Sequence, residues 1–257
     1  MSKDNSILSS SPKIDYTETA PEINAAEFQK VIDSRRSVRV YDGTPIPGEV
    51  VMKCLHNALL APNSSNLQPW EFYWVHTPEK KKELVRACLD QVAAKTAAEL
   101  FVVVARTKTW KGHAKEMLRL LGKSKDVPAL AIKYYSKIVP FVYTQGFFSA
   151  AGLVKRLVYF VKGLGGPIIR EPVSRSHLRL WAVKSTALAA ENLMLSLRAY
   201  GFDSCPMEGL DSKVVKKLLG LAGDASVVMV ISAGKRAPEG IYGQRIRFDP
   251  ERFIRKV

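Results

Sequence analysis

The stretch Ala61-Pro62-Asn63-Ser64-Ser65-Asn66-Leu67-Gln68-Pro69-Trp70 lies between an amphipathic helical pattern and an aromatic, β-rich run. Its side-chain amides and hydroxyls, framed by two prolines, indicate a stiff loop that carries many hydrogen-bonding groups. Such groups can meet a ligand edge that presents both donors and acceptors. Taken alone, however, the loop is explained more simply as a polar turn before a strand. The segments on either side decide between these interpretations.

Upstream, a helix predicted to begin at Asn24 is followed by Arg35-Arg36-Ser37-Val38-Arg39. In an extended segment, alternation places Arg35, Ser37 and Arg39 on one side. Guanidinium forks and hydroxyls match phosphate oxygens, so this side is a candidate phosphate grip. The alternative is a solvated basic helix end that complements the helix dipole.

The remaining apolar patterns predict a succession of helices and strands. Helices are expected at about 48–60, from 78 to about 89, in part of 110–125, at 177–200 and after Asp211, and strands at 71–76, 100–105 and 226–232, with a short extended segment and turn at 203–209. The helix at 177–200 is apolar on more than one side, which is typical of a helix buried from several directions. This pattern suits a central helix shared with a second subunit.

The composition narrows the class of protein. The 257 residues carry a formal net charge of +15, which suggests anionic partners, although a solvated basic surface accounts for most of the excess. Three widely spaced cysteines indicate neither a disulfide framework nor a metal site, so a reducing cytoplasm is expected. The N-terminus has no apolar signal region, and the longest uncharged stretch, 138–154, is too short and too interrupted to span a membrane.

Residues 127–170 contain no Asp or Glu, while basic and aromatic side chains are interleaved along them. Three interpretations are open: a lid or arm over an active site, a membrane-surface element, or a nucleic-acid face. The first is favoured. The glycines at 163, 165 and 166 mark a turn, because no phosphate-loop pattern occurs in the chain.

Four motifs occur in order along the chain: Arg-Arg-Ser-x-Arg, Asn-Ser-Ser-Asn-x-Gln-Pro-Trp, Pro-Met-Glu-Gly, and Arg-x-Arg near the C-terminus. Together they resemble the FMN-dependent nitroreductase family over about residues 24–110 and 177–250. The resemblance implies an α+β fold with a small mixed β-sheet surrounded by helices, in an intertwined homodimer. Residues 1–22 are then a flexible tail, and 23–257 a single FMN-binding domain with a lid or insert at about 127–170.

The resemblance also implies a set of FMN contacts. The phosphate is expected to contact Arg35 and Ser37, together with Arg245 and Arg247. Arg36 belongs to the same flavin-binding segment, and Arg39 is expected to reach the pyrimidine edge of the flavin. The opposite flavin edge is assigned to Pro206, Met207, Glu208 and Gly209, and an amide near the pyrimidine ring to Gln91. The isoalloxazine is expected to be lined from the neighbouring subunit by Asn63, Ser64, Ser65 and Asn66.

The implied activity is passage of hydride from NADH or NADPH through bound FMN to a nitroaromatic, quinone or similar small-molecule acceptor. Orientation and electrostatics suffice for this chemistry, so no catalytic acid or base and no metal is assigned. One alternative is a flavin-binding protein without turnover, for storage or sensing. Another is a basic membrane-surface or nucleic-acid-binding protein. Nucleic acid is not expected as a partner, and a peripheral membrane contact through 138–169 is left open but not expected.

Overall fold

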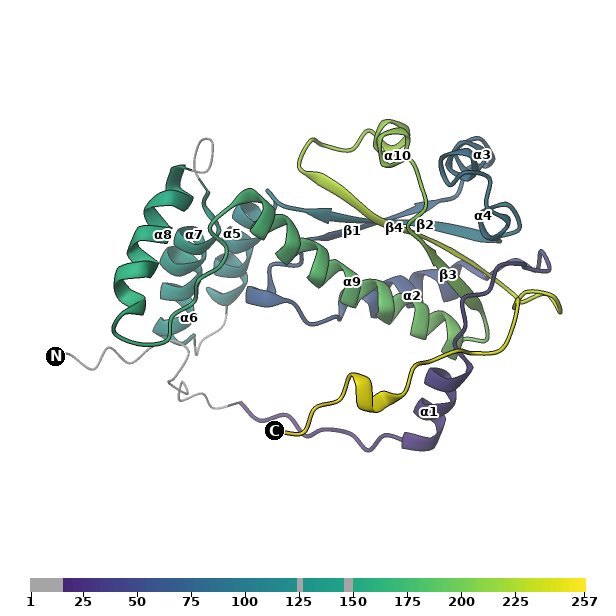
Figure 1. The fold of residues 1–257 in the computed structure, drawn as a ribbon, viewed down its shortest axis with the longest axis horizontal. Helices are drawn as coiled ribbons and strands as arrows, with labels where there is room; N and C mark the ends of the chain where they lie inside the picture. Colours follow the sequence, from purple (N-terminus) through teal and green to yellow (C-terminus); the bar gives the residue numbers. More distant parts are fainter. Residues whose placement is uncertain (1–15, 124–126, 146–149) are drawn as a thin grey trace.

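The computed structural model describes residues 16–123, 127–145 and 150–257 (Figure 1). Most of the predicted tail therefore lies outside the described residues, as does a short part of the 127–170 insert. Residues 16–24 form no helix or strand and are exposed. The division into a tail and a single domain stays a prediction.

A small sheet forms the centre of the fold. Its strands are β1 (Trp70–Val75), β2 (Glu99–Arg106), β3 (Asp203–Met207) and β4 (Ala225–Gly234), in the order β1-β2-β4-β3. All neighbouring strands pair antiparallel. The α+β class is confirmed. The prediction of a mixed sheet is wrong, because the four strands pair only antiparallel. Among the described residues, parallel pairing is limited to the isolated bridge between Ser37 and Ser204.

Helices cover both faces of the sheet and extend beyond one end of it (Figure 1). The helices around the sheet are α1 (Ala25–Ser34), α2 (Gly48–Leu59), α3 (Pro78–Ala87), α4 (Val92–Lys95), α9 (Arg175–Ala199) and α10 (Ser212–Leu219). Those gathered at one end are α5 (Trp110–Leu121), α6 (Ala129–Lys133), α7 (Val139–Tyr143) and α8 (Ala150–Gly163). A short π-helix, η2 (Tyr134–Ile138), lies between α6 and α7. Two short 3-10 turns are η1 (Ser64–Asn66) and η4 (Pro250–Arg252).

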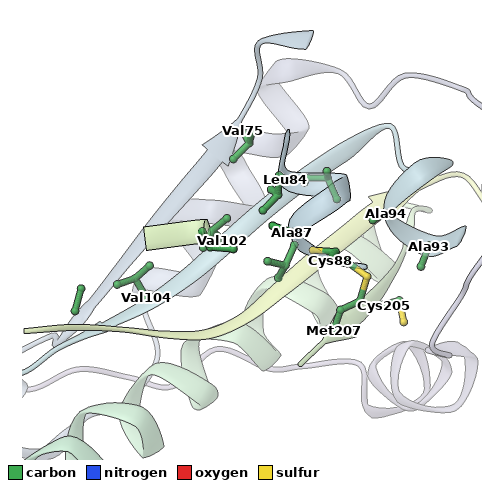
Figure 2. Packing of buried hydrophobic residues seen from close by; sticks show 14 residues of the cluster. Val75, Leu84, Ala87, Cys88, Ala93, Ala94, Val102, Val104, Cys205 and Met207 are labelled. Atoms are coloured by element: carbon green, nitrogen blue, oxygen red, sulfur yellow. The ribbon is translucent and has the colours of Figure 1, made fainter. Parts of the chain in front are cut away.

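Strand β2 is apolar from Leu100 to Ala105, and these residues are covered on both faces of the sheet. Leu100, Val102 and Val104 point to one face, where they pack with α3, α4 and β3 (Figure 2). Phe101 and Val103 point to the other face, where they pack with α2 and α9. Successive side chains of a strand point to opposite faces of the sheet. Because helices cover both faces here, each residue of the run must be apolar.

The ends of two helices follow their predicted capping residues. The Asn24 carboxamide oxygen accepts hydrogen bonds from the backbone N–H groups of Ala26 and Glu27, at 3.1 and 3.3 Å. Asp211 caps α10 in the same way, and Gly220 ends it in the left-handed conformation with φ +61°. These side chains satisfy N–H groups that a helix leaves without partners.

Helix α9 is the long helix expected at 177–200. It buries Leu193 and Leu197 against the sheet and α2, while Leu180 and Leu188 remain exposed. Helix α9 is therefore only weakly amphipathic, because apolar side chains project from two of its sides.

Replacement of Phe101 by Ala should lower the free energy of unfolding by about 3–5 kcal/mol, because Phe101 is fully buried between β2 and the α2–α9 layer. Urea denaturation followed by circular dichroism measures this change. Phe160→Ala, which truncates an exposed ring on α8, is the matched control and should shift stability by less than about 0.5 kcal/mol. Equal unfolding midpoints for the two variants would contradict the packing described here.

Candidate functional site

A pocket of about 210 Å³ lies between the segment after α1 and the C-terminal arm. The segment contributes Arg35, Arg36, Ser37 and Arg39, and the arm contributes residues 241–247, which include Arg245 and Arg247. Among the residues that the structure describes, five arginines thus face one small space and no acidic side chain lines it. The two basic motifs, more than 200 residues apart in the sequence, form one site.

Backbone hydrogen bonds fix the segment that carries the first three arginines. The N–H of Val38 donates to the carbonyl of Ser204 at 3.2 Å, and the N–H of Arg39 donates to Gly240 at 2.8 Å. The Val38 side chain is fully buried. A Cβ at Gly240 would lie 2.6 Å from the Val40 carbonyl oxygen, so only glycine permits this approach of the two segments.

Two of the arginines join the walls of the pocket to each other. Arg36 Nη2 donates to the Gly243 carbonyl at 2.6 Å. Arg245 Nη2 donates to the carbonyl of Asp33 at 2.8 Å and also to that of Arg35. Each guanidinium has five N–H donors, so both retain donors for a ligand after these bonds.

Little negative charge offsets the arginines. A carboxylate oxygen of Glu191 on α9 lies 3.9 Å from Arg35 Nε, and this carboxylate is half-exposed. The Arg39 guanidinium stands over the ring of Tyr242, 5.4 Å from its centroid. An aromatic face orients Arg39 without neutralising it, so the pocket is suited to an anion.

The Pro206–Gly209 motif follows the part of β3 that pairs with the arginine segment, although it does not line the pocket. Pairing of Ser37 with Ser204 sets β3 beside the arginine segment, and residues 206–209 continue from there. Gln91 Nε2 donates to the carbonyls of Gly209 at 2.6 Å and Cys88 at 3.0 Å. With both amide protons engaged, Oε1 of Gln91 is available as an acceptor.

Asp203 anchors the start of β3, and sequence reasoning missed its role. Its buried carboxylate accepts from Arg198 Nη1 at 3.0 Å and from Arg236 Nη2 at 2.7 Å. Asp203 follows the helix-ending turn at Gly201 with no pattern that separates it from an ordinary polar turn residue. Its partners come from α9 and from the segment after β4, which only the fold brings together.

Cys205 lies behind the arginines. Burial raises the pKa of its thiol, while the charges of Arg39 and Arg35 and a contact with Ser37 act in the opposite direction. Cys205 is thus a buried thiol in contact with Ser37, which lines the pocket.

The Asn63–Asn66 loop has an unusual backbone. Ser65, Asn66 and Gln68 adopt positive φ angles of 60°, 47° and 44°, a conformation that costs residues other than glycine about 1–3 kcal/mol each. Asn63 Oδ1 accepts from the Gln68 N–H at 2.7 Å. Such cost persists only where surrounding contacts impose the conformation, and it concentrates at functional sites.

Tyrosines of the predicted 127–170 insert supply contacts to the loop. The Ser65 hydroxyl lies 2.6 Å from the Tyr134 hydroxyl and 3.1 Å from the Tyr143 hydroxyl. The Tyr135 hydroxyl donates to the Ser65 carbonyl at 3.1 Å. In the sequence these tyrosines are among the interleaved aromatic residues of 127–170, and no local pattern connects them to the loop.

Within one chain, the loop and the arginine pocket do not meet. The loop residue Leu67 packs with Leu178 and Trp181 near the start of α9, whereas Arg35 approaches Glu191. Trp181 and Glu191 are about 15 Å apart along the helix axis, at 1.5 Å per residue. The structure thus gathers residues 35–37, 39, 245 and 247 around one pocket and separately joins Gln91 to Gly209, and it leaves 63–66 in another place.

Sequence reasoning also missed part of the pocket wall. Ile241, Tyr242, Gly243, Gln244 and Ile246 line it beside the two predicted arginines. The available signal was Tyr242, an aromatic residue close before the Arg-x-Arg motif.

Comparison with known proteins identifies relatives over most of the chain. A sequence model of the nitroreductase family matches residues 32–235. A protein named NADH dehydrogenase from Thermus thermophilus is 28% identical over 214 residues, covering 82% of this chain and 88% of the relative. YdgI of Bacillus subtilis, named as an NAD(P)H nitroreductase, is 28% identical over 230 residues, covering 88% and 97%.

Among solved structures, a nitroreductase from Exiguobacterium sibiricum, described as a complex with FMN, superposes with a TM-score of 0.63. Its sequence is 24% identical, and the match covers 94% of this chain and all of that one. At this identity the likeness is one of fold.

The arginine pocket should bind inorganic phosphate. If phosphate binds with a dissociation constant of about 1 mM, 10 mM phosphate stabilises the protein by about 1.4 kcal/mol and raises the unfolding temperature by roughly 3–5 °C. Arg245→Gln should abolish this shift in differential scanning fluorimetry at constant ionic strength. Arg255→Gln, outside the pocket on the same arm, is the control. A shift that survives in the Arg245 variant would show that phosphate binds elsewhere.

Proposed function

Because the chain belongs to the nitroreductase family, we propose that it is an FMN-dependent oxidoreductase that takes reducing equivalents from NADH or NADPH. The acceptor we propose is a small organic molecule such as a nitroaromatic or a quinone. The observation that carries this proposal is the pocket of five arginines between residues 35–39 and 241–247. Hydride acceptance and hydride donation are the chemistry that FMN supplies when it is bound.

The donor set of the pocket fits the phosphate end of FMN. Arg35, Ser37, Arg245 and Arg247 combine guanidinium forks with a hydroxyl, and these groups match the oxygens of a phosphate dianion. The hydrogen bonds of Arg36 and Arg245 to backbone carbonyls hold the two walls together before a ligand arrives. Such preorganisation reduces the entropy lost on binding.

The neighbouring groups fit the ring end of FMN. Arg39, held over Tyr242, offers a cation for the pyrimidine edge. The free Oε1 of Gln91 is an acceptor suited to a ring N–H, and the backbone of residues 206–209 offers N–H donors to the opposite edge. A cation at the pyrimidine edge stabilises the negative charge that reduction places there, which favours hydride uptake.

We further propose that the Asn63–Asn66 loop serves the site of a partner subunit. Its distance from the arginines of its own chain supports this arrangement. Exposed apolar side chains on three neighbouring elements supply a candidate dimer surface: Phe28 and Ile32 on α1, Leu180 and Leu188 on α9, and Ile246 and Phe248 on the C-terminal arm. An apolar surface spread over α1, α9 and the arm suits an intertwined homodimer.

The insert is proposed to shape the acceptor space. Its tyrosines fix the Ser65 backbone and side chain, so the insert and the loop present one continuous surface. We assign no catalytic acid or base. Glu208 acts through its backbone position in the 206–209 segment.

An absorbance spectrum of the purified protein, followed by anaerobic addition of NADPH and then NADH, tests the proposed function. Bound flavin that bleaches promptly is the expected result. Bound flavin that does not bleach would favour a storage or sensing protein. Absence of flavin after addition of FMN would overturn the proposal.

Arg35→Ala and Arg245→Ala should each weaken FMN binding roughly ten- to a hundredfold, since a charge-assisted hydrogen bond contributes about 1.5–3 kcal/mol. Fluorescence titration of the apoprotein with FMN measures the change. Arg255→Ala is the matched control on the same arm. Full flavin affinity in both pocket variants would refute the phosphate assignment.

Mixing two inactive variants should restore activity if the loop acts across subunits. One variant carries Arg35→Ala with Arg245→Ala, and the other carries Ser65→Tyr to obstruct the loop. After subunit exchange, about a quarter of the sites should be intact, since half of the dimers are mixed and each has one complete site. Activity that stays at the level of the separate variants would place the loop in the site of its own chain.

A further inference from the structure

Helix α8 presents an apolar surface to solvent. Val154, Leu157, Phe160, Val161 and Leu164, which follows the helix directly, are each between 58% and 75% exposed. At 100° per residue the first four fall within an arc of about 120°. In a helix that packs with one face on its own domain, the apolar arc normally points inward.

One cationic side chain borders this arc directly, and a second lies farther from its other edge. Arg156 lies about 40° beyond Phe160, and Lys162 lies about 80° beyond Val154 on the other side. Both side chains belong to exposed residues. An exposed apolar arc accompanied by exposed cations is the pattern of a helix that lies in a membrane interface.

The opposite side of α8 is fixed to the protein, so the exposed arc cannot simply turn inward. The ammonium group of Lys155 is buried and donates to the carbonyl of Val142 at 2.8 Å and to that of Thr144. Gly152 lies so close to the chain that an added Cβ would be 2.1 Å from the Val173 carbonyl oxygen. These contacts hold α8 against the C-terminal end of α7 and the segment before α9.

The surrounding sequence is free of negative charge. Residues 127–170 contain six Lys or Arg and no Asp or Glu, in a chain with a formal net charge of +15. Each basic residue near an anionic bilayer adds about 1 kcal/mol of attraction, and apolar side chains add their transfer from water.

We propose that α8 docks the protein on an anionic lipid bilayer, with the helix parallel to the surface. Leu157, Phe160 and Val161 enter the acyl boundary, and Arg156 contacts the headgroup phosphates beside them. Lys162 reaches toward the headgroups through its long side chain from the C-terminal end of the helix. In the described part of the chain, no helix is long and apolar enough to cross a membrane. The contact is therefore peripheral.

A second copy of the chain fits this surface less well. In a two-fold contact of α8 with itself, Arg156 and Lys162 would face their own copies with no acid of residues 127–170 to offset them. The apolar residues suited to the dimer lie on α1, α9 and the C-terminal arm, and α1 is at the other end of the molecule from α8 (Figure 1). A nucleic acid would use the cations but has no use for an apolar arc of aliphatic side chains.

Flotation of the flavin-loaded full-length protein with vesicles tests the proposal. We expect binding to vesicles of phosphatidylglycerol and phosphatidylcholine, much weaker binding to phosphatidylcholine alone, and a decrease with rising salt. Leu157→Ser with Val161→Ser should lower the partition coefficient roughly tenfold or more, with flavin content and unfolding temperature unchanged. Val214→Ser, an exposed apolar change on α10, should leave binding unchanged.

A charge-matched pair of variants separates a local contact from the field of the whole chain. Arg156→Glu with Lys162→Glu should abolish binding, whereas Lys213→Glu with Lys217→Glu, an equal change of net charge on α10, should retain most of it. Equal loss in both would overturn a role for α8. So would absence of binding to anionic vesicles, binding to DNA that displaces the lipid, or a Leu157/Val161 variant that changes the oligomeric state in sedimentation without affecting flotation.

Discussion

The pairing of Ser37 with Ser204 is the contact on which the rest of the site depends. It places the arginine segment along the edge strand β3, and the hydrogen bond from Val38 to Ser204 fixes its register. Because side chains alternate along an extended segment, this register buries Val38 and directs its neighbours Ser37 and Arg39 to the pocket. The edge itself is held by the buried carboxylate of Asp203 between Arg198 and Arg236.

Much of this architecture could be predicted from the sequence. The apolar run at 100–105 predicted a buried central strand, and Asn24 and Asp211 predicted helix starts, because these signals act over a few residues. Four short motifs predicted the family, which the family match and the fold confirm. The two arginine motifs were predicted to meet, and they line one pocket.

The parts that escaped prediction depend on contacts between distant segments. The sheet was expected to be mixed, but β1, β2, β4 and β3 pair antiparallel, since strand order depends on how the helices pack and not on local pattern. In the sequence, Asp203 cannot be distinguished from an ordinary polar turn residue, because its partner Arg236 is brought to it only by the fold. In the sequence, Tyr134, Tyr135 and Tyr143 are ordinary aromatic residues. Their hydroxyls contact Ser65, which lies about 70 residues earlier in the chain, and no local pattern predicts that contact.

The strained loop at Ser65 and Asn66 also bears on how such a protein can diversify. Three tyrosine hydroxyls from the insert hold a backbone that those residues would not adopt alone. If the 127–170 segment shapes the acceptor space as proposed, a segment exchanged between homologues would change that space, and it would release the loop unless it retained those hydroxyls. New acceptor preferences should therefore arise most easily through substitutions on the insert that leave these tyrosines unchanged. A chimaera that exchanges the insert should likewise keep all three tyrosines.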